Sequence, residues 1–379
     1  MILTKIKNNK TFGYGNCTSF NACVGKNGYN DIESYKLGYK NCVEVIVKHL
    51  KDNQVNVDSL IYPLLFSARH CLELYLKNLG TIVSLINKNC ESNITAIEIE
   101  KTHDLKKLWE NLKSLSKIDN RFENFILKLD AYITDYFEID LTGETFRYPF
   151  NKNNDHHLDD YSVINILKFE ERFNKAINIL DDFVFCADFL LEEYNQKTFI
   201  KGLSRKIIEE ISLELPDRKH WSDSSFKTTK AEIMHKFSIS SNTLTKVINL
   251  IQKHKEFSSN IGINLPVCDI TKDEFVKFKE LFLCFHNNIE SKKDYIEYKE
   301  QISKLIVTNI SDSAIYALRT FKEIGFFNKY SEEYSPLLNH FKSKNDSNDL
   351  VFSSLLSNQS NINHIESGIN KCGQSQLLI

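Results

Sequence analysis

The sequence predicts an all-α protein. Only 12 glycines and 5 prolines occur among 379 residues, which leaves few helix breakers. Apolar residues recur at helical spacing along most of the chain, and alternating strand patterns are rare. Hydrophobic residues make up 42% and charged residues 26%, as in ordinary globular proteins, and the length is sufficient for two domains.

The first predicted domain covers residues 1–197 and combines a glycine-rich N-terminal segment with a helical bundle. Asp58 is a plausible N-cap for the second helix, and Gly80 a plausible stop. A polar loop over 138–161 precedes the last helix, and long loops in compact helical domains are often functional. The predicted helices cover 31–52, 58–79, 103–117, 121–137 and 162–195.

The second predicted domain covers residues 198–343. It starts with a linker or corner, "LELPDRKHW" (213–221). The Ser/Asn-rich tail over 344–379 predicts one weak helix and a frayed end. The predicted helices cover 229–237, 241–254, 271–291, 293–309, 311–325 and 330–343.

Composition also limits the function classes. The formal net charge of -2 gives no global basic field, although a local basic patch can still bind nucleic acid. The nine cysteines form no CxxC pair, which favours reduced thiols in a cytoplasmic protein. No signal peptide is visible, and no apolar run approaches the roughly 20 residues that span a membrane. We expect no membrane association.

We predict no metal ion or other cofactor. The stretch "DHHLDD" (155–160) has metal-ligating residue types, but consecutive histidines do not easily chelate one ion together. A solvated acidic loop is the simpler interpretation.

The stretch "FSARHCLELYLK" (66–77) places four ionisable residues on an otherwise apolar helix. Because a helix turns about 100° per residue, Arg69, His70, Glu73 and Lys77 form one stripe. A structural interpretation is an Arg69–Glu73 pair at i,i+4 with a snorkelling Lys77. A functional interpretation is a phosphate or base site, with Glu73 orienting Arg69 and His70 acting as general acid or base.

Three segments together resemble the HEPN superfamily of helical domains: "YPLLFSARHCLELYLK" (62–77), "HDLKKLW" (103–109) and "ETFRYPF" (144–150). The resemblance covers roughly residues 30–195. It implies a role in RNA targeting, in phage defence or in a toxin–antitoxin system, together with a homodimer and a partner protein. Many members are RNases, whereas others are inactive binding domains.

The resemblance also implies a metal-independent endoribonuclease mechanism, in which a 2′-hydroxyl attacks the adjacent phosphate. His70 or His103 would handle protons, and Arg69 or Arg147 would stabilise the developing charge. Active members carry an arginine followed, after four to six residues, by a histidine, and none of the seven arginines here has this spacing. The candidate catalytic residues, from several elements, are Arg69, His70, Glu73, His103 and Arg147.

Two of these residues also have structural interpretations. His103 can simply adjoin Asp104, which is placed to cap the following helix. Arg147 can form a buried ion pair where the loop docks on the bundle.

The stretch "KAEIMHKFSISSNTLTKVINLIQKH" (230–254) resembles the helix-turn-helix of bacterial DNA-binding proteins. Ser238 stands where glycine is usual, Ile239 is the apolar plug of the turn, and Ser240 is placed to cap the second helix. The residues expected to pack inward are Ala231, Ile233, Phe237, Leu244, Val247 and Ile248. The predicted nucleic-acid contacts are Ser241, Asn242, Thr245 and Lys246, with Lys77 in the first domain.

Two functional hypotheses follow. The first is an HEPN-like, RNA-targeting protein that cleaves RNA. The alternative is a non-catalytic nucleic-acid-binding or adaptor protein that acts on RNA or DNA through the helix-turn-helix, and in that case the polar stripe is structural.

Overall fold

A computed structural model describes residues 11–53, 57–92, 99–151, 153–200, 202–287, 292–344 and 354–379. Within these ranges every regular element is an α- or 3-10 helix, and the only β-bridges are two isolated ones. The predicted all-α class is therefore confirmed. The chain divides into two compact units, Met1–Leu191 and Glu192–Ile379, so the division falls six residues before the predicted boundary at 197.

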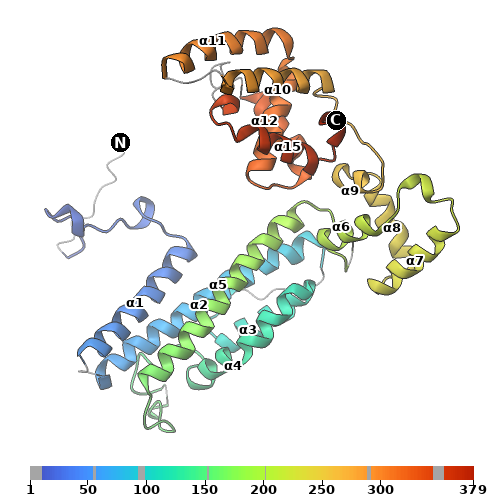
Figure 1. Cartoon of the computed structure of the whole chain (residues 1–379). Helices are drawn as coiled ribbons and strands as arrows, with labels where there is room; N and C mark the ends of the chain where they lie inside the picture. Colours follow the sequence, from blue (N-terminus) through green and yellow to red (C-terminus); the bar gives the residue numbers. More distant parts are fainter. Residues whose placement is uncertain are drawn as a thin grey trace. The chain divides into compact units, whose positions relative to one another are not determined.

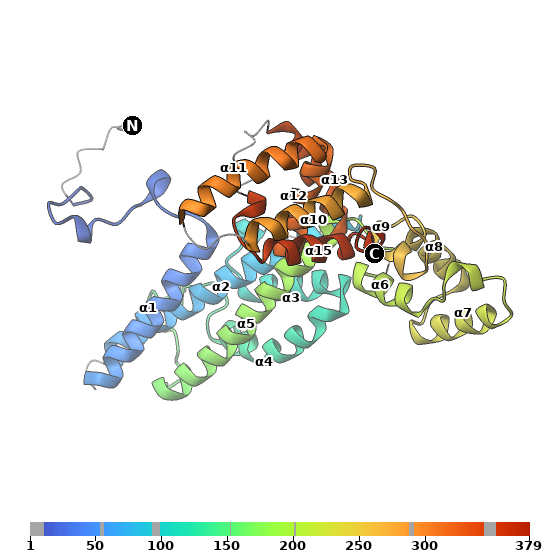
Figure 2. The ribbon, with the colours of Figure 1, turned by 45° about the horizontal axis from the view of Figure 1, so that its top comes forward.

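The N-terminal unit is a bundle of long helices. In Figures 1 and 2, α1, α2 and α5 run side by side, with α3 and α4 against them. The central helix is α2, which buries apolar side chains on most of its circumference. The helices are α1 (Ile32–Asn53), α2 (Val57–Asn89), α3 (Leu105–Leu115), α4 (Glu123–Ile139) and α5 (Ile166–Asn195), preceded by the 3-10 helices η1 (Thr18–Phe20) and η2 (Gly25–Asn27).

The second helix is longer than predicted. Gly80 does not stop α2, which continues to Asn89, and Asp58 lies inside the first turn instead of capping it. Gly80 is buried, and a Cβ atom there would lie 2.9 Å from Cδ1 of Ile99. This glycine therefore permits a close side-chain contact, which the sequence pattern alone does not distinguish from a C-cap.

A polar contact joins the three side-by-side helices α1, α2 and α5. The Tyr75 hydroxyl of α2 donates to Asp181 of α5 at 2.5 Å, and Lys40 of α1 donates to the same carboxylate at 3.1 Å. Because a buried hydroxyl is costly to leave without a partner, this contact favours one arrangement of α1, α2 and α5.

The C-terminal unit contains nine further α-helices with described bounds. Their buried apolar side chains form two clusters, one over residues 203–261 and one over residues 267–377. The first helix, α6, was not predicted. The helices are α6 (Arg205–Glu214), α7 (Ser225–Lys236), α8 (Ser241–Ile251), α9 (Lys255–Asn260), α10 (Lys272–Asn287), α11 (Lys292–Asn309), α12 (Asp312–Phe326), α13 (Tyr334–Ser343) and α15 (Asn361–Lys371).

The prediction of a weakly structured tail is wrong for its described part, 354–379. Helix α15 packs closely on α12, and its Ile365 and Ile369 are fully buried. Two glycines allow this approach, because a Cβ atom on Gly325 or on Gly368 would lie 1.9 Å from a carbonyl oxygen of the other helix. The polar composition of the tail concealed a narrow apolar stripe.

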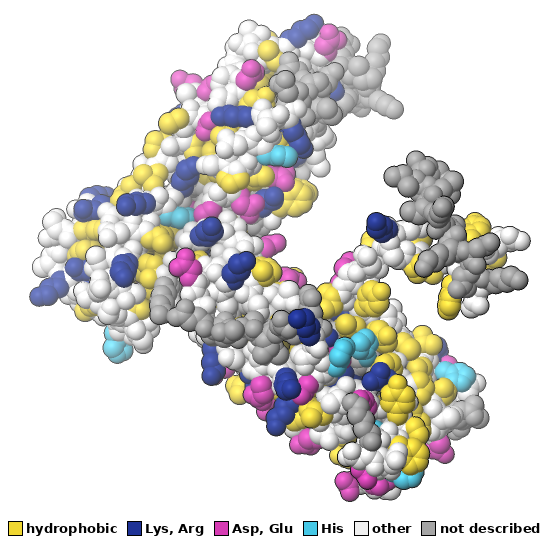
Figure 3. Space-filling model, turned by 180° about the vertical axis from the view of Figure 1, so that it is seen from behind, with side chains coloured by type: hydrophobic (Ala, Val, Ile, Leu, Met, Phe, Trp, Pro, Cys, Tyr) yellow, Lys and Arg dark blue, Asp and Glu magenta, His cyan; other side chains and the backbone are white. Residues whose placement is uncertain are grey.

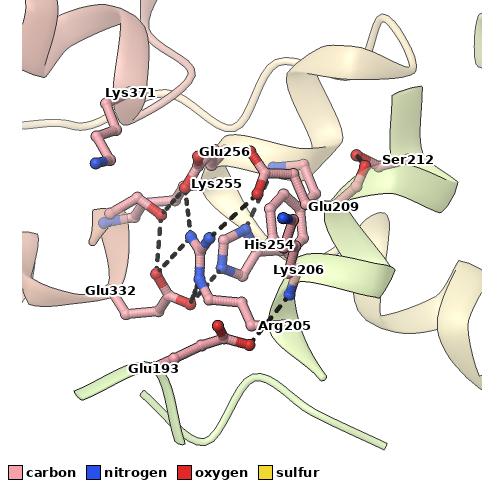
Figure 4. A network of polar contacts seen from close by, with 12 residues as sticks. Glu193, Arg205, Lys206, Glu209, Ser212, His254, Lys255, Glu256, Glu332 and Lys371 are labelled. Atoms are coloured by element: carbon pink, nitrogen blue, oxygen red, sulfur yellow. Dashed lines mark hydrogen bonds and ion pairs between the residues drawn. The ribbon is translucent and has the colours of Figure 1, made fainter. Parts of the chain in front are cut away.

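A buried polar network lies between the two apolar clusters of this unit (Figure 4). The Arg205 side chain of α6 donates to Glu332 at 2.8 Å and to Glu256 of α9 at 2.5 Å. His254 is 3.0 Å from the same Glu332 carboxylate. The Arg205 guanidinium also lies over the Phe257 ring, 4.8 Å from its centre. Charge pairing therefore contributes to the contact between α6, α9 and the 3-10 helix η7 (Ser331–Glu333).

Candidate active site

The carboxylate of Glu73 is the centre of the polar stripe and is only 1% exposed. One oxygen accepts from Arg69 Nη1 at 2.5 Å. The other accepts from Lys77 Nζ at 3.0 Å and from His103 Nδ1 at 2.8 Å. His70 Nδ1 lies 3.9 Å from Oε2. The structure therefore brings together five of the residues that the sequence singled out.

Helix geometry and one cap explain this arrangement. Residues four apart lie on one face of α2, which aligns Arg69, Glu73 and Lys77. His103 comes from the segment before α3, where Asp104 caps the helix by accepting from Lys107 N at 3.0 Å. The predicted cap is confirmed, and it fixes the backbone beside His103.

Arg69 is buried and bonded entirely to the protein. Its Nη2 donates to the His103 carbonyl at 2.5 Å and to the Leu141 carbonyl at 3.2 Å, and its Nε donates to the Asp140 carbonyl at 3.3 Å. Gly143, at a φ of +86°, packs on the guanidinium, where a Cβ atom would lie 3.2 Å from Cζ. The buried Arg69 side chain is therefore not placed to hold a phosphate, contrary to the expectation from the sequence.

The surroundings of Glu73 keep it ionised. Burial raises the pKa of this carboxyl, but the close contacts from Lys77 and His103, together with the nearby His70, outweigh burial. The pKa therefore lies well below its ordinary value of 4.5. An anionic Glu73 can fix the orientation of the two histidines at neutral pH.

His103 has a defined tautomer and an accessible ring. Because an ionised carboxylate only accepts hydrogen bonds, the proton of this pair lies on His103 Nδ1. The neutral ring then carries a lone pair on Nε2, and 66% of the side chain is exposed. An arrangement in which a buried carboxylate orients a histidine is typical of a general base.

The loop after α4 presents Arg147. Asp140, which is buried, accepts from Gly143 N at 2.8 Å and from Thr145 N at 3.2 Å, and so fixes the loop. Arg147 Nε donates to the Gly143 carbonyl at 2.6 Å, and its guanidinium lies 5.9 Å from the centre of the Phe66 ring. The expected buried ion pair is wrong, because Arg147 is exposed and its hydrogen bond goes to a backbone carbonyl.

His70 lies among aromatic rings beside this arginine. Its ring stacks on Phe66, with centroids 5.9 Å apart, and meets Tyr39 of α1 edge-on at 4.4 Å. Phe66 therefore contacts both His70 and Arg147. Sequence reasoning missed Tyr39 and Asp140. The turn-forming Asp140-to-Gly143 stretch was the available signal for Asp140, whereas nothing local marked Tyr39.

The "DHHLDD" loop contributes no residue to the contacts described around Glu73. His156 packs on the Phe150 ring, with centroids 4.3 Å apart. Over the described ranges, no group of three or more His, Cys, Asp or Glu side chains is placed to hold a metal ion.

The predicted helix-turn-helix segment forms two helices joined by a short turn. Ser238 adopts a φ of +52°, in the left-handed region where glycine is usual. The Ser240 side chain accepts from Thr243 N at 3.2 Å, so the predicted cap of α8 is confirmed.

The two helices expose and bury the residues largely as expected. Of the residues expected to pack inward, Ala231 is exposed, and Phe237 and Ile248 are only half-buried. The four predicted contact residues of α8 all lie on its exposed face: Ser241, Asn242, Thr245 and Lys246.

No model of a known protein family, no curated protein and no solved structure matches this chain. Among the described residues, no helix combines the length and the apolar character needed to cross a membrane.

Proposed function

We propose that the N-terminal unit is an HEPN-like endoribonuclease that acts without a metal ion. The observation that carries this proposal is the exposed His103 ring, held by the buried Glu73 carboxylate at 2.8 Å. His70 and Lys77 surround the same carboxylate. Arg147 contacts the ring on which His70 stacks.

In the proposed reaction, His103 Nε2 accepts the proton of a ribose 2′-hydroxyl. The oxygen attacks the adjacent phosphorus, and the bond from phosphorus to the 5′-oxygen breaks. His70, in its protonated form, donates a proton to that leaving oxygen. The products are a 2′,3′-cyclic phosphate and a 5′-hydroxyl, and no metal ion or other co-reactant is needed.

Charge in the transition state requires cationic groups at the surface of the site. Arg147 is suited to this task because it is exposed and its Nε is already anchored on Gly143. Lys77, which the sequence predicted as a nucleic-acid contact, is only 13% exposed and is paired with Glu73, so its charge balances that carboxylate inside the cluster. Arg69 holds Glu73 and the His103 carbonyl in place.

A defined oligonucleotide tests the mechanism. Purified protein in EDTA should cut a single-stranded RNA and leave a 2′,3′-cyclic phosphate. Replacing the nucleotide before the cut with its 2′-deoxy form should abolish cleavage at that position only. Cleavage that survives the 2′-deoxy substitution, or that leaves a 5′-phosphate, would rule out the proposed attack by the 2′-hydroxyl.

The resemblance to HEPN proteins also suggests the biological setting. We propose a role in phage defence or in a toxin–antitoxin system, acting as a homodimer with a partner protein in the cytoplasm. Expression of the wild-type chain should slow bacterial growth, and His103→Ala should relieve that effect. Equal toxicity of the two would count against this setting.

A second candidate function is nucleic-acid binding through α8. The observation that favours it is the exposed polar face of α8 after a left-handed turn at Ser238. Asn242→Ala and Lys246→Ala should each weaken binding of duplex DNA or RNA, whereas Arg147→Ala should not. Unchanged binding in both α8 variants would exclude this function.

A further inference from the structure

A hollow lies between the N-terminal segment and the first long helix. It has a volume of about 410 Å³ and is lined by residues within 23–30 and 34–42, the second range belonging to α1. This size is in the range of pockets that bind small ligands. Neither the proposed reaction nor the α8 face uses it.

The lining of this pocket is aromatic and uncharged. Tyr29, Tyr35 and Tyr39 contribute three phenol rings, and Tyr29 is 91% exposed. Figure 3 shows hydrophobic side chains at the surface of the N-terminal segment and over the adjoining bundle. No charged residue is among those that line the pocket, so its chemistry suits a flat neutral group and not a phosphate.

One ring separates the pocket from the candidate active site. Tyr39 lines the pocket, and its ring meets His70 edge-on with centroids 4.4 Å apart. On its stacked face His70 meets Phe66, which in turn contacts Arg147. A group in the pocket would therefore lie beside the residues that act on the phosphate.

We propose that this pocket binds one unstacked nucleobase of a single-stranded RNA whose backbone crosses the candidate active site. Bases flipped out of single strands stack on tyrosine rings, and their edges form hydrogen bonds with neighbouring polar side chains. Asn30 and Ser34 also line the pocket and offer such groups. This inference rests on the proposed RNA-cleaving function and specifies its substrate.

Gly38 provides a sharp test of the pocket. It lies in α1 and lines the pocket, and an added Cβ atom there would meet no atom within 4 Å. Leucine favours the helix more than glycine does, so Gly38→Leu should fill the pocket without unfolding the chain. Thermal unfolding checks that assumption directly.

The experiment uses the full chain with His103→Ala, so that bound RNA stays intact. The probe is a labelled 10-nucleotide single-stranded RNA, with an abasic nucleotide placed at each position in turn. One abasic position should weaken binding about 5- to 150-fold, the range for one stacked base. Gly38→Leu should weaken binding of the intact RNA by a similar factor. In that variant, placing the abasic nucleotide at the same position should not weaken binding further. Tyr161→Ala, an exposed tyrosine outside this pocket, is the matched control and should bind like its parent.

The outcomes separate the pocket from the reaction. If wild-type protein cuts RNA but neither Gly38→Leu nor any abasic site weakens binding, the pocket proposal is overturned and the proposed function stands. If wild-type protein neither binds nor cuts RNA, both fail. Equal loss of affinity in Gly38→Leu and Tyr161→Ala would also overturn the pocket, because the effect would not be local.

Discussion

At the scale of single residues, the candidate site combines two deeply buried charged side chains with two exposed ones. Arg69 and Glu73 are each 1% exposed, whereas His103 and Arg147 reach the surface. The sequence predicted that Arg69 and Glu73 share one helix face, because residues four apart align. It did not predict their burial, which depends on carbonyl groups from Asp140 and His103, far away in the chain.

This contrast in burial predicts different effects of two arginine substitutions. Arg69→Ala removes one of the hydrogen-bond donors to the buried Glu73 carboxylate and leaves three carbonyls without their Arg69 donor, so it should lower the free energy of unfolding by roughly 3–5 kcal/mol. Arg147→Ala removes an exposed side chain and should change it by about 0.5 kcal/mol or less. Urea unfolding of both variants measures the difference. Equal effects would contradict the assigned burial of Arg69.

The depressed pKa of Glu73 predicts how stability depends on pH. A carboxyl whose pKa is lower in the folded state stabilises the protein above its unfolded value, near 4.5, and this contribution is lost as the pH falls further. Glu73→Gln should therefore be clearly less stable than wild type at pH 7, and the gap should narrow below about pH 4.5. Urea midpoints between pH 7 and 3 measure this gap. A gap that stays constant would show that the Glu73 pKa is not depressed.

At the scale of elements, the sequence correctly predicted helix ends that depend only on neighbouring residues. Ser240 capped α8 as predicted, because a serine side chain satisfies the first amides wherever the helix begins. Gly80 was wrongly predicted to end α2, because glycine also allows close packing inside a helix. Helix α15 was hidden by its polar composition, and only its packing on α12 shows why it is stable.

The turn between α7 and α8 gives a prediction at this scale. Ser238 has a φ of +52°, which costs an L-residue about 1–2 kcal/mol, whereas glycine adopts it freely. Ser238→Gly should raise the free energy of unfolding by about 0.5–1 kcal/mol, since part of the gain is lost to the more flexible unfolded chain. Ser238→Val should lower it, because a branched side chain resists this conformation. The reverse order in thermal unfolding would contradict the assigned turn.

The Arg205 network gives a second prediction about elements. Arg205 is 4% exposed and donates hydrogen bonds to Glu256 and Glu332 (Figure 4). His254 contacts the same Glu332 carboxylate. Arg205→Ala leaves Glu256 and Glu332 without their shared cation, and should lower the free energy of unfolding by roughly 3–5 kcal/mol. Arg218→Ala, an exposed arginine, is the matched control and should cost about 0.5 kcal/mol or less. A small effect of Arg205→Ala in urea unfolding would show that α6 does not depend on this network.

At the scale of the whole molecule, the two units contain two different candidate surfaces. The N-terminal unit holds the histidines around Glu73, and the C-terminal unit exposes the polar face of α8. The sequence indicated the α8 face and the α2 stripe because each is a short continuous pattern, but that His103 joins this stripe is seen only in the fold. It could not predict the contact of His70 with Tyr39 or the placement of Arg147, because these join helices and loops that only the fold brings together.

The most direct test of the central claim is incubation of total RNA in EDTA with four purified full-length proteins. These are wild type, His103→Ala, Arg147→Ala and His235→Ala, the last being an exposed histidine of α7 that serves as the matched control. RNA cut by wild type and His235→Ala, but spared by His103→Ala and Arg147→Ala, is the predicted result. RNA cut equally by wild type and His103→Ala, or left intact by wild type, would contradict the account.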